Sequence, residues 1–321
     1  MTQQEHPKMP DTGPVVAAFG GIHLDRIGHA THAIRADTST PGKIAAQPGG
    51  VAVNVARVLA SLGTRTALCG SIGEDSDGAF LMSALPSRNL NLSMVRRDGT
   101  YPTATYLALH NPDGNLAAAL VDTRLTEALT FAHFDFSSPE IASANLWFLD
   151  ANLNRNVLDD ISQGAEHRLI AADTVSIAKA GRLAPLLKRL NIVFTNRSEA
   201  SALLETTFEN AAEAARALVE AGVRTAVVSD GAAPLAAAQS EVAGSPSVHH
   251  LQPLSANVVD VTGVGDALIG ATLHGLLDGL IIQDALSLGA AAAAITLETE
   301  GATPLDLSPE HLHMRLKECP K

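Results

Sequence analysis

Short apolar runs alternate with helical patterns along most of this chain, and this alternation constrains the fold more than any other feature. Apolar residues recur at helical spacing over 54–62, and 211–221 is a second strong helical pattern. Strand-like apolar runs occupy 15–19, 66–73, 146–149, 169–172, 192–194 and 225–229. Repeated strand–helix order predicts an α/β chain with a three-layer α/β/α, Rossmann-like fold, in which helices cover both faces of a parallel sheet. Ligands of such sheets bind at the carboxyl ends of the strands.

Two segments, about 26–47 and 99–121, do not follow that order because their sequence is alternating and rich in threonine. Asn111-Pro112-Asp113-Gly114 is a hairpin-type turn, and Leu116–Val121 would be its return strand. We therefore expect these segments to form a small antiparallel sheet outside the main domain. A pair of unrelated surface hairpins is the alternative.

Composition agrees with a compact globular protein. The chain has 321 residues, of which 46% are hydrophobic and 17% charged, so it can bury a large core. Its formal net charge of −12 argues against a nucleic acid polymer or an anionic membrane as partner, although a free nucleoside remains acceptable.

The N-terminal segment and the cysteines suggest a cytoplasmic protein. Residues 1–13 are polar and lack the apolar core of a signal peptide, so we expect a loose tail before one domain at 14–321. Cys69 and Cys319 make neither a disulfide framework nor a zinc site, and a reducing cytoplasm fits.

One motif near the C-terminus points to chemistry: Asp260-Val261-Thr262-Gly263-Val264-Gly265-Asp266. A strand-like run precedes the glycines and a helix-like stretch follows the last aspartate. Glycines let the backbone approach a ligand, and N–H groups at a helix start bind anions. A carboxylate in a phosphate site is costly unless it accepts the proton of a hydroxyl that attacks a phosphoryl group. Taken alone, the pattern also fits an ordinary glycine turn in which the aspartate caps a helix.

Two further motifs accompany it in a recognisable order, Pro48-Gly49-Gly50-Val51-Ala52-Val53-Asn54 and Asn196-Arg197-Ser198-Glu199. With these three motifs the chain resembles the ribokinase-like (PfkB-type) family of sugar and nucleoside kinases over nearly all residues after 14. The resemblance implies a ribokinase-type fold, ATP with Mg²⁺, and possible activation by K⁺. It also implies that the small sheet is a lid over the sugar, which in the family often pairs two subunits into a homodimer.

The resemblance also assigns catalytic roles. Asp266 would accept the proton of the attacking hydroxyl. Backbone N–H groups of Gly263, Val264 and Gly265 would hold the developing negative charge.

For the acceptor, the resemblance assigns Asp25 to a pair of sugar hydroxyls, since a carboxylate can accept two hydrogen bonds. Gly49 and Gly50 would let the sugar approach the backbone, and Asn54 would reach a ribose hydroxyl. Further polar residues are expected near the acceptor: His23, Thr105 and Asn152. For His23 the alternative is packing beneath the lid.

For the nucleotide, the resemblance assigns Asn196 and Glu199 to magnesium and phosphate, with Glu199 acting through water. The alternative for this pair is two polar residues that start a helix. Nucleotide contacts are also expected from Ser229, Gly231, Thr262, Gly263 and Gly265. Pro234 departs from the family pattern, which has a second glycine there. Asp260 with the 301–304 loop would hold the monovalent cation.

Several segments resemble family members that phosphorylate the 5′-hydroxyl of pseudouridine, a pyrimidine C-nucleoside. They are 41–44, 105–109, 173–176 and 196–200. Val51 stands where ribokinases commonly carry lysine. Pseudouridine is therefore the expected acceptor, and ribose, adenosine or another sugar is the alternative. A non-catalytic sugar or nucleoside sensor is the rival of a different class, but a sensor needs no general base.

Overall fold

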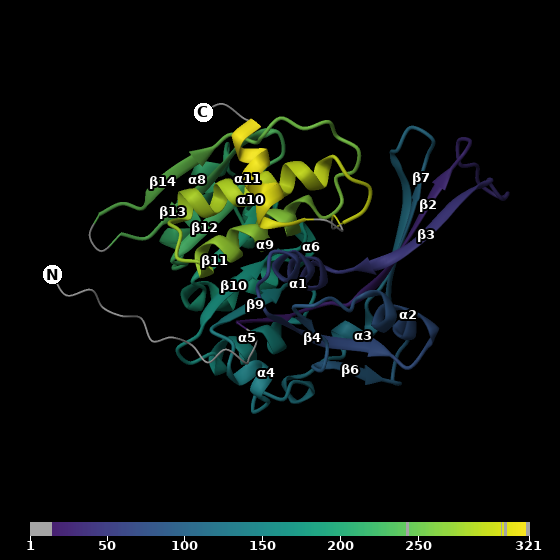
Figure 1. Cartoon of the computed structure of the whole chain (residues 1–321), viewed down its shortest axis with the longest axis horizontal. Helices are drawn as coiled ribbons and strands as arrows, with labels where there is room; N and C mark the ends of the chain where they lie inside the picture. The colour runs from purple at the N-terminus through teal and green to yellow at the C-terminus, as the bar shows by residue number, and fades with distance from the viewer. Residues whose placement is uncertain (1–14, 242–243, 303, 305–306, 319–321) are drawn as a thin grey trace.

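A computed structural model describes residues 15–241, 244–302, 304 and 307–318. Its main body is built on one ten-stranded sheet, in the order β14-β13-β12-β11-β10-β9-β1-β4-β5, with β6 also paired to β4 (Figure 1). The strands are β1 (Val16–Phe19), β4 (Thr66–Gly73), β5 (Leu90–Asn91), β6 (Val95–Asp98), β9 (Leu146–Asp150), β10 (Leu169–Asp173), β11 (Ile192–Asn196), β12 (Thr225–Asp230), β13 (Ala233–Gln239) and β14 (Ser247–Leu251). All of its strand pairs are parallel except β12–β13 and β13–β14.

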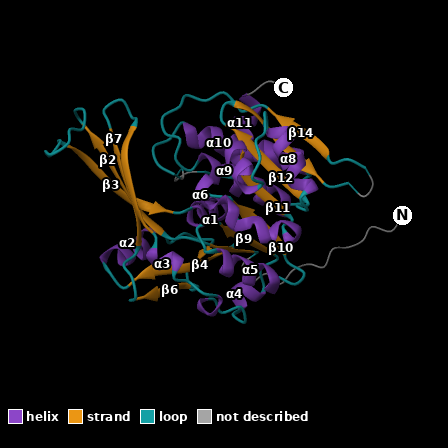
Figure 2. Ribbon diagram, turned by 180° about the vertical axis from the view of Figure 1, so that it is seen from behind, coloured by secondary structure: helices purple, strands orange, loops and turns teal. Residues whose placement is uncertain are grey.

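Helices cover both faces of this sheet, as Figure 2 shows from behind. One apolar cluster packs α5 (Arg155–Gly164), the 3-10 helix η2 (Gly181–Arg189), α7 (Arg197–Leu203) and α8 (Ala211–Glu220) against the sheet. A second cluster packs α1 (Val51–Ser61), α2 (Ser76–Ala84), α9 (Val264–Leu277) and α10 (Ile282–Leu297) against it. The remaining helices are α3 (Arg124–Glu127), η1 (Phe131–His133), α4 (Pro139–Ala142), α6 (Ile177–Ala180) and α11 (Pro309–Glu318).

These layers confirm the predicted α/β/α architecture. Side chains of one strand alternate between the two apolar clusters: Phe19 lies in the first, and Val16 and Ala18 lie in the second. This alternation is why a strand buried on both faces reads as a continuous apolar run. Within the described residues, no helix is long and apolar enough to cross a membrane.

A second, four-stranded sheet stands off the main body, in the order β3 (Gly42–Gly49), β2 (His23–Ala30), β7 (Ala104–His110) and β8 (Leu116–Asp122) (Figure 1). We call it the small sheet. Its β7–β8 hairpin turns at Gly114, whose φ is +82°. The expectation of a purely antiparallel sheet is wrong, because β2 and β7 pair in parallel. A long chain segment that includes α1 and β4 separates these two strands, so no tight turn forces them to run in opposite directions.

The strand expected just before the Gly263 motif is absent. Val258, Val259 and Val261 are 66%, 57% and 71% exposed and belong to an irregular segment. The Val259 N–H donates to the carbonyl of Leu297, at the end of α10, at 2.7 Å. This segment therefore runs past a helix end rather than joining the sheet.

Candidate active site

The Gly263 motif forms a tight turn into the N-terminus of α9. Gly263 caps this helix with a φ of +73°, and a side chain there would collide with the carbonyl of Ala302. Glycine is therefore required at this position. The turn puts the N–H groups of Val264 and Gly265 and the Asp266 carboxylate in the first helical turn, where the helix dipole favours negative charge.

Asp266 meets Asn54, which comes from α1 on the same face of the sheet. The Asn54 amide donates to Asp266 Oδ2 at 2.7 Å, while its own Oδ1 is buried without a partner. Burial, with smaller contributions from the nearby Asp150 and Asp25 carboxylates, raises the pKa of Asp266 to about 7, although the hydrogen bond from Asn54 opposes the rise. A carboxylate with a pKa near neutrality is suited to accept a proton at physiological pH.

The glycine pair explains how Asp25 reaches this region. Asp25 lies on β2 and is 9% exposed, and a side chain at Gly49, on the paired strand β3, would collide with its carboxylate. Gly50 has a φ of +102°, and a side chain there would collide with the carbonyl of Gly21. Burial raises the pKa of Asp25 to about 6.

Asp150, at the end of β9, is a central residue that sequence reasoning missed. Its fully buried carboxylate accepts N–H groups from Ala52 at 2.8 Å and from Asn152 at 2.9 Å, and also from Gly21 at 3.3 Å. Burial raises the pKa of Asp150 although these hydrogen bonds oppose the rise. Asp150 thus connects three chain segments at the carboxyl edge of the sheet. Its position at the end of a predicted strand is the sequence feature that could have identified it as a site residue.

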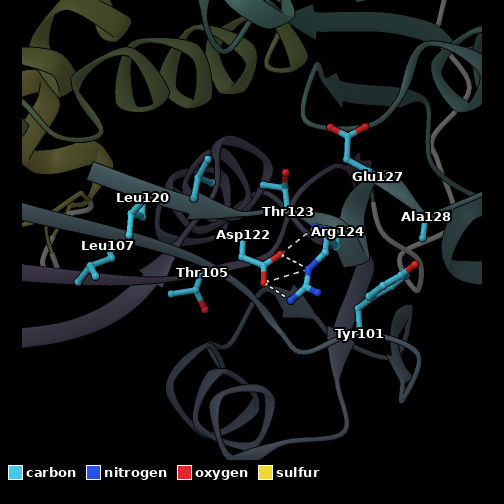
Figure 3. Close-up of a pocket in the computed structure, with 10 residues that line it drawn as sticks. Tyr101, Thr105, Leu107, Leu120, Asp122, Thr123, Arg124, Glu127 and Ala128 are labelled. Atoms are coloured by element: carbon cyan, nitrogen blue, oxygen red, sulfur yellow. Dashed lines mark hydrogen bonds and ion pairs between the residues drawn. The ribbon is translucent and has the colours of Figure 1, made fainter. Parts of the chain in front are cut away.

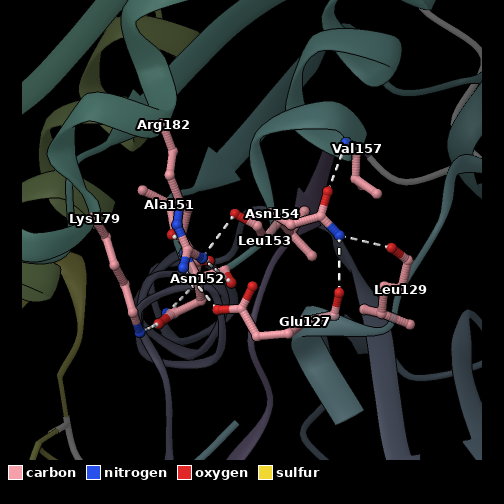
Figure 4. Close-up of polar contacts among 10 residues, drawn as sticks. Glu127, Leu129, Ala151, Asn152, Leu153, Asn154, Val157, Lys179 and Arg182 are labelled. Carbon is pink, nitrogen blue, oxygen red and sulfur yellow. Dashed lines mark hydrogen bonds and ion pairs between the residues drawn. The ribbon is translucent and has the colours of Figure 1, made fainter. Parts of the chain in front are cut away.

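Asn152 is held on both sides of its side-chain amide. Its Nδ2 donates to Asp150 at 3.1 Å, and its Oδ1 accepts from Lys179 Nζ at 2.6 Å. Figure 4 shows Lys179 and Arg182 reaching toward Asn152 from the neighbouring helical segment. Arg182 donates to the carbonyls of Ala151, Asn152 and Leu153 and pairs with Glu127 at 2.7 Å.

His23 lies beside Asn152 with an unpaired ring nitrogen. A side chain at Gly21 would contact both His23 Nε2 and Asn152 Cβ, so these atoms line the same corner. Nε2 is buried without a hydrogen-bond partner. Burial and then the Lys179 charge lower the pKa of His23 to about 4, so the imidazole is neutral at pH 7.

The Asn-x-x-Glu motif begins α7 and also faces Asp266. Asn196 caps the helix, and the Glu199 carboxylate accepts a hydrogen bond from the Asn196 N–H, so both residues do start a helix. Glu199 also accepts from the Thr174 hydroxyl at 2.5 Å. A pocket of about 160 Å³ brings the motif together with the turn at Gly263, and its lining includes Asp173, Asn196, Glu199, Ser229, Gly265 and Asp266.

Asp173, at the end of β10, is a second residue that sequence reasoning missed. Burial raises its pKa well above the usual range, and the nearby carboxylates of Asp266 and Glu199 raise it further. Its Oδ1 accepts the N–H of Val175, which has a φ of +64°, a strained value for a β-branched residue.

The loop after β12 borders a neighbouring pocket of about 760 Å³, whose lining includes Ser229, Gly231 and Gly265. Asp230 pairs with Arg197 at 2.9 Å, which fixes the loop against α7. Pro234 lies in β13, where the pairing with β12 shifts register, so its missing N–H is tolerated there.

Asp260 links the turn at Gly263 to the loop at Gly301. It accepts the N–H of Thr262 at 2.8 Å and that of Gly301 at 3.0 Å. Burial raises the pKa of Asp260, but these hydrogen bonds outweigh it and leave the pKa lowered. Thr303, part of the expected cation loop, lies outside the described residues.

The structure does not bring the predicted site residue Thr105 to this group. On β2 and β7, Asp25 pairs with Tyr106 and Leu24 pairs with Thr105, so Asp25 and Thr105 face opposite sides of the small sheet. Figure 3 shows Thr105 in another pocket, of about 820 Å³, with Leu107 and the Asp122–Arg124 ion pair.

Comparisons with known proteins agree with this architecture. The profile of the pfkB family carbohydrate kinases matches residues 15–308. The chain is 25% identical over 296 residues to pseudouridine kinase from Escherichia coli (strain K12), covering 91% of this chain and 93% of the relative.

Two solved structures illustrate the likeness in three dimensions. A carbohydrate kinase from Agrobacterium tumefaciens has a TM-score of 0.82 and 30% identity, with 95% of this chain and 98% of that chain covered. The Arabidopsis thaliana ribokinase complexed with ribose and ATP has a TM-score of 0.81 and 19% identity, with 95% and 99% covered, and so shares the fold. By its family match and its fold, the chain belongs to the pfkB family of carbohydrate kinases, phosphotransferases with an alcohol as acceptor.

Proposed function

We propose that this protein is an ATP-dependent kinase that phosphorylates the 5′-hydroxyl of a nucleoside, with pseudouridine as its acceptor. The observation that carries the proposal is the contact between Asn54 and Asp266 at the N-terminus of α9, with a pKa near 7 for Asp266. A carboxylate with a pKa near 7, next to N–H groups that bind anions, suits the transfer of a phosphoryl group to a hydroxyl.

In the proposed reaction, Asp266 accepts the proton of the acceptor's 5′-hydroxyl as that oxygen attacks the γ-phosphorus of ATP in line. The N–H groups of Gly263, Val264 and Gly265 bind the phosphoryl oxygens during transfer. Asp25 and Asn54 hold the ribose hydroxyls. The unpaired, buried Asn54 Oδ1 is an acceptor suited to one of them.

The residues on the nucleotide side suit magnesium. The pocket next to Asp266 offers only oxygen ligands, from Asp173, Asn196 and Glu199. Mg²⁺ prefers oxygen and keeps several waters, so Glu199 can act through water while it caps α7. When bound, Mg²⁺ would neutralise charge on the phosphates. Asp260 with the Gly301 loop is the proposed monovalent-cation site, and stimulation by K⁺ over Na⁺ tests it.

Pseudouridine is favoured as acceptor by the E. coli relative and by the polar corner formed by His23, Asn152 and Lys179. Free ribose would leave that corner without a partner. Ribose, adenosine and other sugars are the alternatives within the family. A non-catalytic sensor would need no general base, so the environment of Asp266 favours an enzyme.

The test is a phosphorylation screen with ATP and magnesium across pseudouridine, uridine, adenosine and ribose. The proposal expects the highest kcat/KM for pseudouridine and a 5′-phosphate as product. A preference for ribose or adenosine would refute the pseudouridine assignment and leave the kinase assignment intact.

We also propose that the small sheet acts as a lid and pairs with its counterpart in a homodimer. Its large apolar residues are unusually exposed, Ile44 by 76% and Leu120 by 73%, and a second copy would cover them. Sedimentation analysis tests the pairing, and a purely monomeric enzyme at micromolar concentration would contradict it.

We also propose a cytoplasmic location, which fits the described cysteine, Cys69, because it is a buried free thiol.

A further inference from the structure

Lys179 is a charged group in the polar corner with His23 and Asn152, and it lies outside the three sequence motifs described above. It lies on α6, six residues beyond Asp173 at the carboxyl end of β10, and its side chain is half-buried. Among the residues that the structure describes, its one hydrogen-bond partner is Asn152 Oδ1, at 2.6 Å. An ammonium group has three N–H donors, so two remain for a ligand.

The surrounding contacts fix where Lys179 points. Asp150 accepts both the backbone N–H and the side-chain Nδ2 of Asn152, which leaves Oδ1 turned toward Lys179 (Figure 4). Arg182, a few residues further along, holds the carbonyls of the same loop. The lysine is therefore held in position by a network that forms without any ligand.

The corner also holds an unsatisfied buried atom. His23 Nε2 is buried and unpaired, and His23 itself is 7% exposed. Natural proteins rarely leave such an atom without a partner unless a ligand or water completes it. Lys179 offers charged N–H donors, and the neutral His23 ring offers one nitrogen. These groups suit a polar, uncharged heterocycle that carries carbonyl oxygens.

Position decides which part of the acceptor would meet these groups. Asp150 lies between two clusters: Ala52 leads into α1 and to Asn54 with Asp266, whereas Asn152 leads to Lys179. If the reacting 5′-hydroxyl lies at Asp266, the opposite end of the ribose, which carries the base, lies toward Lys179.

We propose that Lys179 determines acceptor specificity by donating a hydrogen bond to the base carbonyl next to the glycosidic bond of a pyrimidine-dione nucleoside. This inference rests on the proposed nucleoside kinase function. Uridine and pseudouridine both carry such a carbonyl, whereas ribose has no base and adenine has no carbonyl. Lys179 therefore separates pyrimidine-dione nucleosides from other acceptors, and it does not separate pseudouridine from uridine.

The experiment compares Lys179→Met with wild type, using pseudouridine, uridine and ribose as acceptors. Loss of a hydrogen bond from a charged donor should lower kcat/KM for both nucleosides by about 10- to 100-fold. The value for ribose should stay within about twofold of wild type, which also reports that the variant is folded. Lys179→Gln keeps a donor for Asn152 and should lose less. Lys188→Met, an exposed lysine on η2, is the matched control and should match wild type.

Calorimetry without ATP gives a readout independent of turnover. The proposal expects weaker pseudouridine binding by Lys179→Met and unchanged ribose binding. Equal losses for nucleosides and ribose would overturn it, because Lys179 would then only support the Asn152 loop. If wild type phosphorylates neither sugars nor nucleosides, the proposed function itself fails, and the inference fails with it.

Discussion

At the scale of single residues, the account rests on carboxylates whose surroundings give them different roles. Asp150 is saturated by backbone and side-chain N–H groups and acts as a structural tie. Asp266 has one hydrogen bond and a pKa raised to about 7. Asp25 is buried against Gly49 with a pKa raised to about 6. Asp150 therefore has a structural role, whereas Asp266 and Asp25 keep hydrogen-bonding capacity for a ligand.

Asp266→Asn should abolish most turnover and leave binding in place. Asparagine keeps the size of the side chain and removes the proton acceptor, so kcat should fall by about 100- to 10,000-fold. Steady-state kinetics with the preferred acceptor measures the loss. Near-wild-type kcat in this variant would rule out Asp266 as the base.

The pKa of Asp266 predicts how activity depends on pH. Only the ionised carboxylate accepts a proton, so kcat/KM for the acceptor should rise with pH and level off above about 7. The raised pKa also makes stability depend on pH. The protonated Asp266 side chain stabilises the folded protein at low pH, and this stabilisation is lost as pH rises through about 7. Asp266→Asn should therefore raise Tm at pH 8 more than at pH 5. An equal change in Tm at both pH values would show that ionisation of Asp266 does not affect folding.

Asp25→Ala should weaken acceptor binding selectively. Removing the carboxylate leaves ribose hydroxyls without an acceptor, at a cost of about 1–3 kcal/mol. Calorimetry should show this loss for the nucleoside and almost none for ATP. Equal losses for both ligands would mean that Asp25 is structural.

At the scale of elements, most of the fold could be predicted from the sequence and part of the site could not. Strands buried on both faces, such as β4 and β9, stood out because their apolar runs are continuous. Val258–Val261 has the same local pattern, yet it runs past the end of α10, which no local pattern reveals. Asp150 and Lys179 were missed because long-range hydrogen bonds define their roles.

Thr105 shows why a motif can mislead on the small sheet. Successive side chains on a strand point to opposite faces, so an assignment shifted by one residue moves a side chain out of the site. Tyr106, the next residue, pairs with Asp25 and shares its face. Thr105→Val should thus leave the acceptor preference unchanged, in contrast to His23→Ala, which should narrow the gap between pseudouridine and uridine. A competition assay at equal concentrations of the two nucleosides measures both.

The junction of β3 and α1 yields a prediction about glycine. Gly49→Ala would force the Asp25 carboxylate to move, so acceptor KM should rise at least about tenfold with little change in ATP KM. Gly164→Ala is the matched control, since a side chain there meets only the Phe131 ring at 3.9 Å. Unchanged acceptor KM in Gly49→Ala would show that Asp25 can adjust without loss.

At the scale of the whole molecule, the sheet edge and the small sheet together enclose the proposed reaction. The carboxyl ends of β9, β10 and β11 carry Asp150, Asp173 and Asn196, and α9 brings Asp266 to the same edge. The small sheet brings Asp25 from outside the main body. In the proposed reaction, the acceptor and the nucleotide would approach Asp266 from two sides, which is the arrangement that in-line transfer requires.

The most direct test of this account is to incubate the protein with ATP, magnesium and pseudouridine and to identify the product by mass spectrometry and NMR. The account predicts pseudouridine 5′-phosphate and ADP in equal amounts, with a kcat/KM above that for uridine, ribose or adenosine. It also predicts almost no product with Asp266→Asn. Hydrolysis of ATP without transfer to any sugar or nucleoside would contradict the central claim.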